Sequence, residues 1–227
     1  LLLGAWKSME DSAVKDQLMS GVQQIFSTGQ GFAALKGDGS VIAWGSDVPG
    51  WDSSAVQDEL MSSVQHVFST GTSLAALKDD GSVITWGNPE WGGDSSAVQD
   101  QLMSGVQQIF STFTSFAALK DDGSVVTWGG ESAGGKSLLH LINTSAVQDQ
   151  LMSGVQQIFS NGSSFAAIKD DGNVVTWGME EYGGDSSAVK DQLISGVQQI
   201  FSARYAFAAL KDDGSVVTWG RDEYGGN

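Results

Sequence analysis

Cysteine is absent from the 227 residues, and histidine occurs only at His66 and His140. Without cysteine the chain can form no disulfide, no thiolate metal site and no cysteine nucleophile. The two histidines lie in different segments, so they offer no histidine pair, and a metal site would have to consist of carboxylates alone. The sequence therefore predicts neither a metal nor a cofactor.

Basic side chains are also scarce, with 11 lysines and arginines against 27 acidic residues and a formal net charge of −16. A field of this sign repels phosphate backbones and anionic lipid, and the basic residues form no local cluster that would reverse it. The sequence also contains no apolar run long enough for a membrane-spanning helix. We therefore expect no nucleic-acid partner and no membrane insertion.

One stretch, FAALKDDGSVVTWG at 116–129, recurs five times in close copies, and the rest of the chain connects these copies. The copies end in Trp-Gly at steps of 42, 42, 49 and 42 residues, the tryptophans being Trp44, Trp86, Trp128, Trp177 and Trp219. Such a period is typical of β-propeller blades. We predict one repeat domain over 1–227, with units at about 8–45, 53–87, 95–129, 144–178 and 186–220 and an insertion near 130–143.

Each copy has the pattern of a β-hairpin. On both sides of Asp121-Asp122-Gly123-Ser124, successive side chains fall alternately on the two faces of a strand, with a period of two residues. Asp-Gly between two such strands is a strong hairpin signal. Both faces of each strand carry apolar side chains, which suits a sheet covered on both sides by neighbouring sheets. The β-branched run Val106 to Phe110, bounded by turn residues, predicts a further strand before the hairpin.

The segment that precedes this strand, Asp94 to Met103, fits two structures. Val98, Leu102 and Val106 are spaced like one face of a helix, with Ser or Asp as a cap, but the segment also suits a short strand. We name the segment at Asp94 to Met103 A, the strand at Val106 to Phe110 B, and the two strands of the hairpin C and D, and we use the same letters in every repeat. The expected fold is an all-β propeller of about five four-stranded blades, strand A being replaced by a short helix in the alternative.

The repeated core Leu-Lys-x-Asp-Gly-x-Val-x-x-Trp-Gly resembles the regulator of chromosome condensation repeat family over all five units. The short units are also similar to those of beta-lactamase inhibitor proteins. The resemblance implies a β-propeller and, among activities, enzyme inhibition or regulation of a small GTPase, although the chain has no long wedge-like insertion for nucleotide exchange. The chain departs from the pattern at the usual histidine, which is Gly31, Ser73, Ser115, Ser164 or Ala206, and at the glycine two positions earlier, which is Phe113 or Arg204 in two units.

Five units allow either a closed five-bladed ring or an open arc, including part of a larger ring. Leu1 to Trp6 lack an initiator methionine and the basic start of a signal peptide. We therefore expect either a processed product or a piece of a longer array.

Sequence variation among the units collects in two connections. The C–D turns and the A–B turns have nearly the same sequence in all units. The B–C loops read TGQG, TGTS, TFTS, NGSS and ARYA, and the D–A linkers also vary from unit to unit. In an antiparallel blade these two variable connections emerge at the same end. Loops on a rigid scaffold are where binding specificity normally lies, so this end is the predicted binding surface.

The variable end holds the candidate partner-binding residues. Aromatic side chains and arginine anchor protein interfaces because they bury a large area at little entropic cost. An alternative interpretation is that the aromatic rings only pack as spacers between blades. The apolar insertion at Lys136 to Ile142 either docks a partner or fills the end of the propeller. The candidates are Trp51, Trp91, Phe113, Lys136, Leu138, Leu139, His140, Leu141, Tyr182, Arg204, Tyr205 and Tyr224.

Function follows from these patterns only as a class. Repetition argues against an enzyme, because an active site needs residues that differ from copy to copy. The Asp-Asp-Gly turns lack the alternating aspartates of a calcium loop and are explained by hairpin geometry. We expect a non-enzymatic protein-interaction module or scaffold subunit. The alternatives are a carbohydrate-binding propeller with Trp91, Tyr182 and Tyr224 as one stacking platform per blade, and a chain that only spaces an array.

Overall fold

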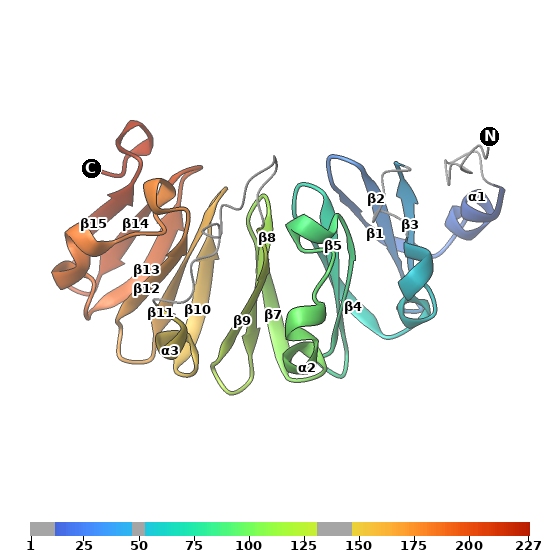
Figure 1. Ribbon diagram of the computed structural model, residues 1–227, viewed down its shortest axis with the longest axis horizontal. Coiled ribbons are helices and arrows are strands. Elements are labelled where there is room, and N and C mark those ends of the chain that lie inside the picture. Colours follow the sequence, from blue (N-terminus) through green and yellow to red (C-terminus); the bar gives the residue numbers. More distant parts are fainter. Residues whose placement is uncertain (1–11, 47–52, 131–146) are drawn as a thin grey trace. The chain divides into compact units, whose positions relative to one another are not determined.

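The computed structural model describes residues 12–46, 53–130 and 147–227, whose contacts divide the chain into two compact units, 1–106 and 107–227. Within the described residues the strands form five three-stranded antiparallel sheets in simple sequential order (Figure 1). Unit 1 contains β1 (Val22–Ser27), β2 (Gly31–Lys36), β3 (Val41–Gly45), β4 (Val64–Ser69), β5 (Ser73–Lys78) and β6 (Val83–Gly87). The prediction of a single domain and the alternatives of ring and arc stay predictions.

The remaining three sheets belong to unit 2, whose first strand begins at Val106, the last residue of unit 1. Their strands are β7 (Val106–Ser111), β8 (Ser115–Lys120), β9 (Val125–Gly129), β10 (Val155–Ser160), β11 (Ser164–Lys169), β12 (Val174–Gly178), β13 (Val197–Ser202), β14 (Ala206–Lys211) and β15 (Val216–Gly220). The three strands of each sheet are the predicted segments B, C and D.

The predicted hairpins are confirmed. In the third sheet β8 pairs with β9 so that Phe116 lies opposite Trp128. Gly123 occupies the turn at φ 75°, and its N–H donates to the carbonyl of Lys120 at 3.0 Å. A side chain at this φ would be strained, which explains why glycine recurs there.

The turn carboxylates form hydrogen bonds within the hairpin. The hydroxyl and the backbone N–H of Ser124 donate to Asp122 at 2.5 and 2.9 Å. These two bonds lower the pKa of Asp122 below the 3.8 of an unperturbed aspartate, and the bond from the hydroxyl has the larger effect. The corresponding serines lower the pKa of Asp38, Asp80 and Asp213 in the same way.

We expect these turns to lose stability in acid. Because the folded-state pKa of Asp122 lies below its unfolded value, its contribution is fully present above about pH 4 and is lost as the pH falls through the folded pKa. Urea unfolding of the wild type and of Asp122→Asn at successive pH values should show a difference in unfolding free energy that shrinks with acidification. A difference that does not change with pH would contradict this assignment.

The expected fourth strand is not confirmed. Segment A is helical in each of the five repeats, and each sheet has three strands. In α2 (Gln99–Leu102) the last leucine is fully buried against the sheets, and Leu60, Leu151 and Leu193 are buried at the same position, whereas Leu18 of the first repeat is partly buried. A lysine of strand C then satisfies a carbonyl of the last helical turn, as Lys78 Nζ does for Glu59 at 3.1 Å. The other helical segments are α1 (Ser12–Leu18), η1 (Ser53–Val56), η2 (Glu59–Met61), η4 (Ser96–Val98), α3 (Gln148–Leu151) and η6 (Ser187–Gln192). Among the described helices, none has the length and apolar character needed to cross a membrane.

The core lies between neighbouring sheets within each unit. Alanines at the middle of strand C, such as Ala166 and Ala167, are completely buried and let the adjacent sheets approach closely. On four of the five sheets the tryptophan of strand D stacks on the phenylalanine opposite it in strand C, as Trp177 does on Phe165 with ring centroids 5.2 Å apart. On the second sheet Trp86 lies opposite Leu74 instead. The tryptophans of the Trp-Gly pairs are thus buried packing residues, as the sequence predicted.

Candidate functional site

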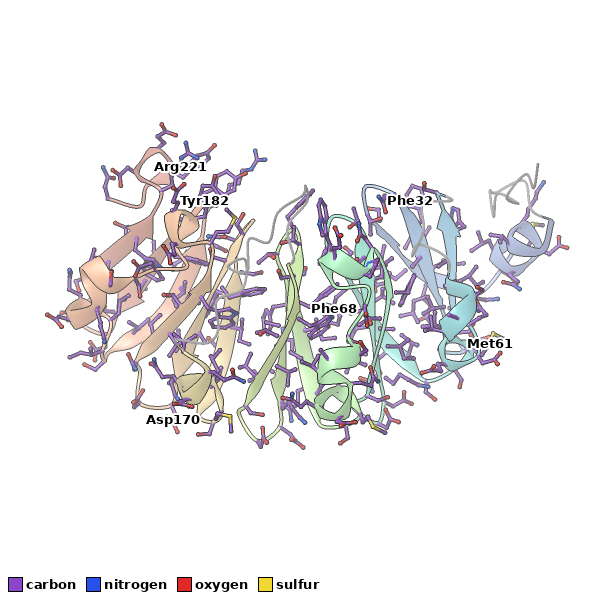
Figure 2. All side chains as sticks on the ribbon, viewed as in Figure 1. Phe32, Met61, Phe68, Asp170, Tyr182 and Arg221 are labelled. Carbon is purple, nitrogen blue, oxygen red and sulfur yellow. The ribbon has the colours of Figure 1, made fainter. Side chains whose placement is uncertain are left out.

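Among the described residues, the B–C loops and the D–A linkers that contain η3, η5 and η7 lie at one end of each sheet, and the C–D turns lie at the other. Figure 2 shows Tyr182 and Arg221 together at one end of unit 2 and Asp170 at the opposite end. The two variable connections touch each other directly: the backbone N–H of Arg221, in the last linker, donates to the carbonyl of Tyr205, in the last B–C loop, at 2.9 Å.

Each described linker places one aromatic side chain at the variable end by a short 3-10 turn. These turns are η3 (Pro89–Trp91), η5 (Glu180–Tyr182) and η7 (Asp222–Tyr224). Each ends on a glycine with positive φ, such as Gly183 at 100°. In the fourth repeat the side chain of Asn161, in the B–C loop, donates to the carbonyl of Tyr182 at 2.7 Å. The loop therefore fixes the position of the linker.

Three tyrosines of unit 2 form one cluster at this end. Tyr205 stacks on Tyr182 with ring centroids 4.3 Å apart and planes at 30°. On Tyr205, Tyr224 packs edge to face at 5.0 Å and 82°. Offset stacking and edge-to-face packing are the favourable arrangements for aromatic pairs. The three rings come from η5, from the last B–C loop and from η7, so they join two repeats.

Two arginines complete this group, and they are the only arginines in the sequence. The guanidinium carbon of Arg204 lies 5.1 Å from the centre of the Tyr205 ring, and that of Arg221 lies 5.7 Å from the centre of Tyr182. Arg221 also forms an ion pair with Glu223 at 3.1 Å, and this carboxylate raises the pKa of Arg221 further. We call Tyr182, Arg204, Tyr205, Arg221 and Tyr224 the tyrosine cluster.

Glycine at position 162 provides the space for Tyr205. A Cβ atom on Gly162 would lie 3.4 Å from Cε1 of Tyr205 and 3.0 Å from the carbonyl oxygen of Arg204. The N–H of Gly162 donates to that carbonyl at 3.0 Å, and the carbonyl of Gly162 accepts from the N–H of Phe113 at 3.0 Å. Three successive B–C loops of unit 2 are thus linked through their backbones.

The structure therefore brings together four of the residues selected from the sequence, Tyr182, Arg204, Tyr205 and Tyr224. Phe113 is exposed on the B–C loop two repeats before Arg204. Trp91 lies in unit 1, half-buried on η3, and its carbonyl accepts from the hydroxyl of Thr70 at 3.3 Å. The other candidates lie outside the described residues: Trp51, Lys136, Leu138, Leu139, His140 and Leu141.

Sequence reasoning missed Arg221. It lies in the linker Arg-Asp-Glu-Tyr, three residues before a tyrosine already selected. The rarity of arginine in this chain was the available signal. In the parts of the chain that the structure describes, no group of three or more His, Asp or Glu side chains is placed to hold a metal ion.

No protein-family model matches the chain, and no curated protein matches it. Solved structures do resemble it. It shares 18% identity with Prp20p from Saccharomyces cerevisiae, at a TM-score of 0.52 over 88% of this chain and 57% of that one. Human WBSCR16 is also 18% identical, at a TM-score of 0.50 over 90% of this chain and 63% of that one.

The yeast protein also appears in complex with Kap60, and in that structure the TM-score is 0.51 over 88% of this chain and 56% of that one. This chain thus spans less than two thirds of the length of the matching chain in each of these three structures. At such identities the likeness concerns the fold alone. The five described sheets are blades of the β-propeller type, and the tyrosine cluster lies at their variable end.

Proposed function

We propose that this protein is a non-enzymatic binding module that docks a protein partner through the tyrosine cluster. The observation that carries the proposal is the gathering of three tyrosines and both arginines of the chain on one surface of otherwise repetitive blades. Tyrosine and arginine are enriched among the residues that dominate binding energy at protein interfaces.

The cluster is also preorganised. Stacking fixes the ring of Tyr205, and the ion pair with Glu223 fixes Arg221, so a partner loses less side-chain entropy on binding. Arg204 is exposed and offers a cation on a strongly acidic protein. A partner surface with a carboxylate opposite Arg204 and an apolar side chain over Tyr205 fits this chemistry.

Similar folds support the protein-binding class. Yeast Prp20p, which resembles this chain in fold, has been solved in complex with Kap60, and its binding to Gsp1p and histones has been described. We extend only the class of partner, protein, to this chain. The repeat pattern resembles the regulator of chromosome condensation family, and we include membership of that family in the proposal. On that basis the protein partner is an enzyme that this chain inhibits or a small GTPase that it regulates.

The carbohydrate alternative needs a separate, accessible ring on each blade. In unit 2 the stacking of Tyr205 on Tyr182 and the packing of Tyr224 on Tyr205 merge the platforms of two repeats into one group. This arrangement favours one protein site over several equivalent sugar sites.

The test is affinity capture from the source extract, followed by titration of the purified captured protein. Tyr205→Ala removes the central ring, and loss of a hot-spot residue costs about 2 kcal/mol or more, which is roughly a 30-fold rise in Kd. We expect a smaller effect from Tyr182→Ala, because Tyr205 remains on the surface.

A matched control is Ile194→Ala, which removes an exposed apolar side chain from the A–B turn at the other end of the last repeat. It should leave the Kd unchanged. Equal affinity of the wild type and Tyr205→Ala, with both folded by circular dichroism, would refute the docking site. Binding of a glycan panel that Trp91→Ala and Tyr224→Ala weaken equally would support the carbohydrate alternative instead.

A further inference from the structure

Each A–B turn exposes one large apolar side chain. The turn follows segment A directly, and the last leucine of that segment, such as Leu60 or Leu102, is buried in the core. The next side chain along the chain is instead between 56% and 75% exposed in every repeat. Packing of the core therefore does not explain an apolar residue at this position. The exposed residues are Met19, Met61, Met103, Met152 and Ile194.

Backbone hydrogen bonds join the A–B turns and the C–D turns of a unit in one continuous surface. In unit 1 the N–H of Asp79, in the second C–D turn, donates to the carbonyl of Ser63, in the A–B turn of the same repeat, at 2.9 Å. The carbonyl of Gly81, in that C–D turn, accepts from the N–H of Val106, just after the A–B turn of the third repeat, at 3.0 Å. The second C–D turn thus lies between two A–B turns, each of which carries an exposed methionine.

Unit 2 has the same arrangement, and its coordinates place carboxylates over the A–B turns. The N–H of Asp170 donates to the carbonyl of Gly154 at 2.8 Å, and a Cβ atom on Gly154 would lie 3.2 Å from Oδ1 of Asp170. In the last repeat a Cβ atom on Gly196 would lie 2.9 Å from Oδ1 of Asp212. Figure 2 shows Asp170 at this end of unit 2, opposite Tyr182. We call the A–B turns and C–D turns of each unit its methionine end.

The methionine end is strongly negative. The second to fifth C–D turns each carry two aspartates, and all of these side chains are exposed. One lysine, at the end of strand C, accompanies each pair. In unit 2 the ammonium groups of Lys169 and Lys211 donate to carbonyls of segment A at 2.6 and 2.7 Å. Each of these turns therefore presents two carboxylates against one lysine, and the ammonium groups of Lys169 and Lys211 are already engaged.

Charge decides which kind of molecule can cover this surface. A second copy of this chain has a net charge of −16 and is repelled. The chain's own segments do not fit, because its 11 lysines and arginines are isolated and the closest two, Arg204 and Lys211, are seven positions apart. Anionic lipid and nucleic acid are repelled like the second copy. Exposed apolar side chains bordered by carboxylates match a partner segment that combines several basic side chains with apolar ones.

We propose that the methionine end is a docking surface for a basic protein segment that carries apolar side chains. Methionine is flexible and polarisable, so it adapts to the apolar side chains of the segment. The carboxylates of the C–D turns lie beside the A–B turns and pair with the lysines or arginines of the segment. In unit 2 this surface and the tyrosine cluster lie at opposite ends, so the inference does not depend on the proposed function.

Fluorescence anisotropy with a labelled peptide of leucine and lysine, arranged as a basic amphipathic helix, tests the proposal on the whole chain. Two control peptides replace either all leucines by serine or all lysines by glutamate. The wild type should bind the leucine–lysine peptide, and it should bind the serine–lysine peptide at least about tenfold more weakly, because burial of one large apolar side chain accounts for such a factor. It should not bind the glutamate peptide. Equal affinity for the first two peptides, or no binding of the leucine–lysine peptide, would overturn the proposal.

Two variants of the protein separate the apolar contribution from the charged one. The apolar variant should raise the Kd for the leucine–lysine peptide at least about tenfold. The charge variant should raise the Kd and make it less sensitive to salt. The apolar variant carries Met19→Ser, Met61→Ser, Met103→Ser, Met152→Ser and Ile194→Ser. The charge variant carries Asp79→Asn, Asp121→Asn, Asp170→Asn and Asp212→Asn.

A matched control neutralises four exposed carboxylates in the linkers at the opposite end of the sheets. Its Kd for the leucine–lysine peptide should stay close to that of the wild type, and so should the Kd of Tyr205→Ala, which lacks the centre of the tyrosine cluster. An apolar variant that is folded by circular dichroism and binds as tightly as the wild type would refute the docking surface. So would a control that loses as much affinity as the charge variant. The control carries Glu90→Gln, Glu180→Gln, Glu181→Gln and Asp222→Asn.

Discussion

Replacing Trp177 by alanine is expected to lower the free energy of unfolding by about 3–5 kcal/mol. The indole is 1% exposed, stacks on Phe165 at 5.2 Å and belongs to the core between the third and fourth repeats. Sheets on both sides are closely spaced by buried alanines, so the surroundings have few large side chains that can collapse into the cavity. Most of the loss is therefore packing.

Urea unfolding followed by far-ultraviolet circular dichroism measures this loss without relying on tryptophan fluorescence. Met152→Ala is the matched control, because this side chain lies in the same repeat and is exposed. Its effect should stay within about 0.5 kcal/mol. If Trp177→Ala unfolds within about 1 kcal/mol of the wild type, the assignment of the tryptophans as the main packing residues is wrong.

The hairpins, the buried tryptophans and the number of repeats could be predicted from the sequence because their causes are local. Asp122-Gly123 determines its own turn, and the step between tryptophans fixes the repeat. Segment A could not be decided in the same way. Its apolar spacing fits a helix, but the contact that stabilises the helical form is tertiary: Lys78 of strand C satisfies the carbonyl of Glu59.

The candidate site was predictable in its location but not in its geometry. Comparison of the repeats identified Tyr182, Tyr205 and Tyr224. That Tyr205 joins the other two depends on the absence of a side chain at Gly162, in a loop 42 residues before Arg204. Arg221 enters the cluster only through its position over Tyr182, which no spacing in the sequence indicates.

Close packing between the linker and the sheet gives the second large expected effect. Gly184 follows η5, and a Cβ atom there would lie 2.6 Å from both the carbonyl carbon and the carbonyl oxygen of Gly178 at the end of β12. The N–H of Gly184 also donates to the carbonyl of Met179 at 2.9 Å, so the chain has little freedom to move away. The same arrangement recurs at Gly226, close to Gly220.

We expect Gly184→Ala to destabilise the protein by roughly 3 kcal/mol, the upper part of the range for overpacking, because the obstructing atoms are backbone. Gly225→Ala is the matched control: it lies in the equivalent linker of the last repeat at φ 87°, with nothing within 4 Å of its Cβ position. It should cost only the strain of the left-handed conformation, about 1–2 kcal/mol. Urea unfolding of both variants measures the difference, and an equal cost for the two would contradict the steric origin.

The same substitution links the fold to the proposed site. Gly184 follows Tyr182 by two residues, so a linker displaced by an added methyl group also displaces the ring on which Tyr205 stacks. We therefore expect Gly184→Ala to weaken partner binding beyond its effect on the folded fraction, and Gly214→Ala, at the opposite end of the last repeat, to leave binding unchanged. Loss of stability without loss of affinity in the folded Gly184→Ala protein would separate the linker from the site.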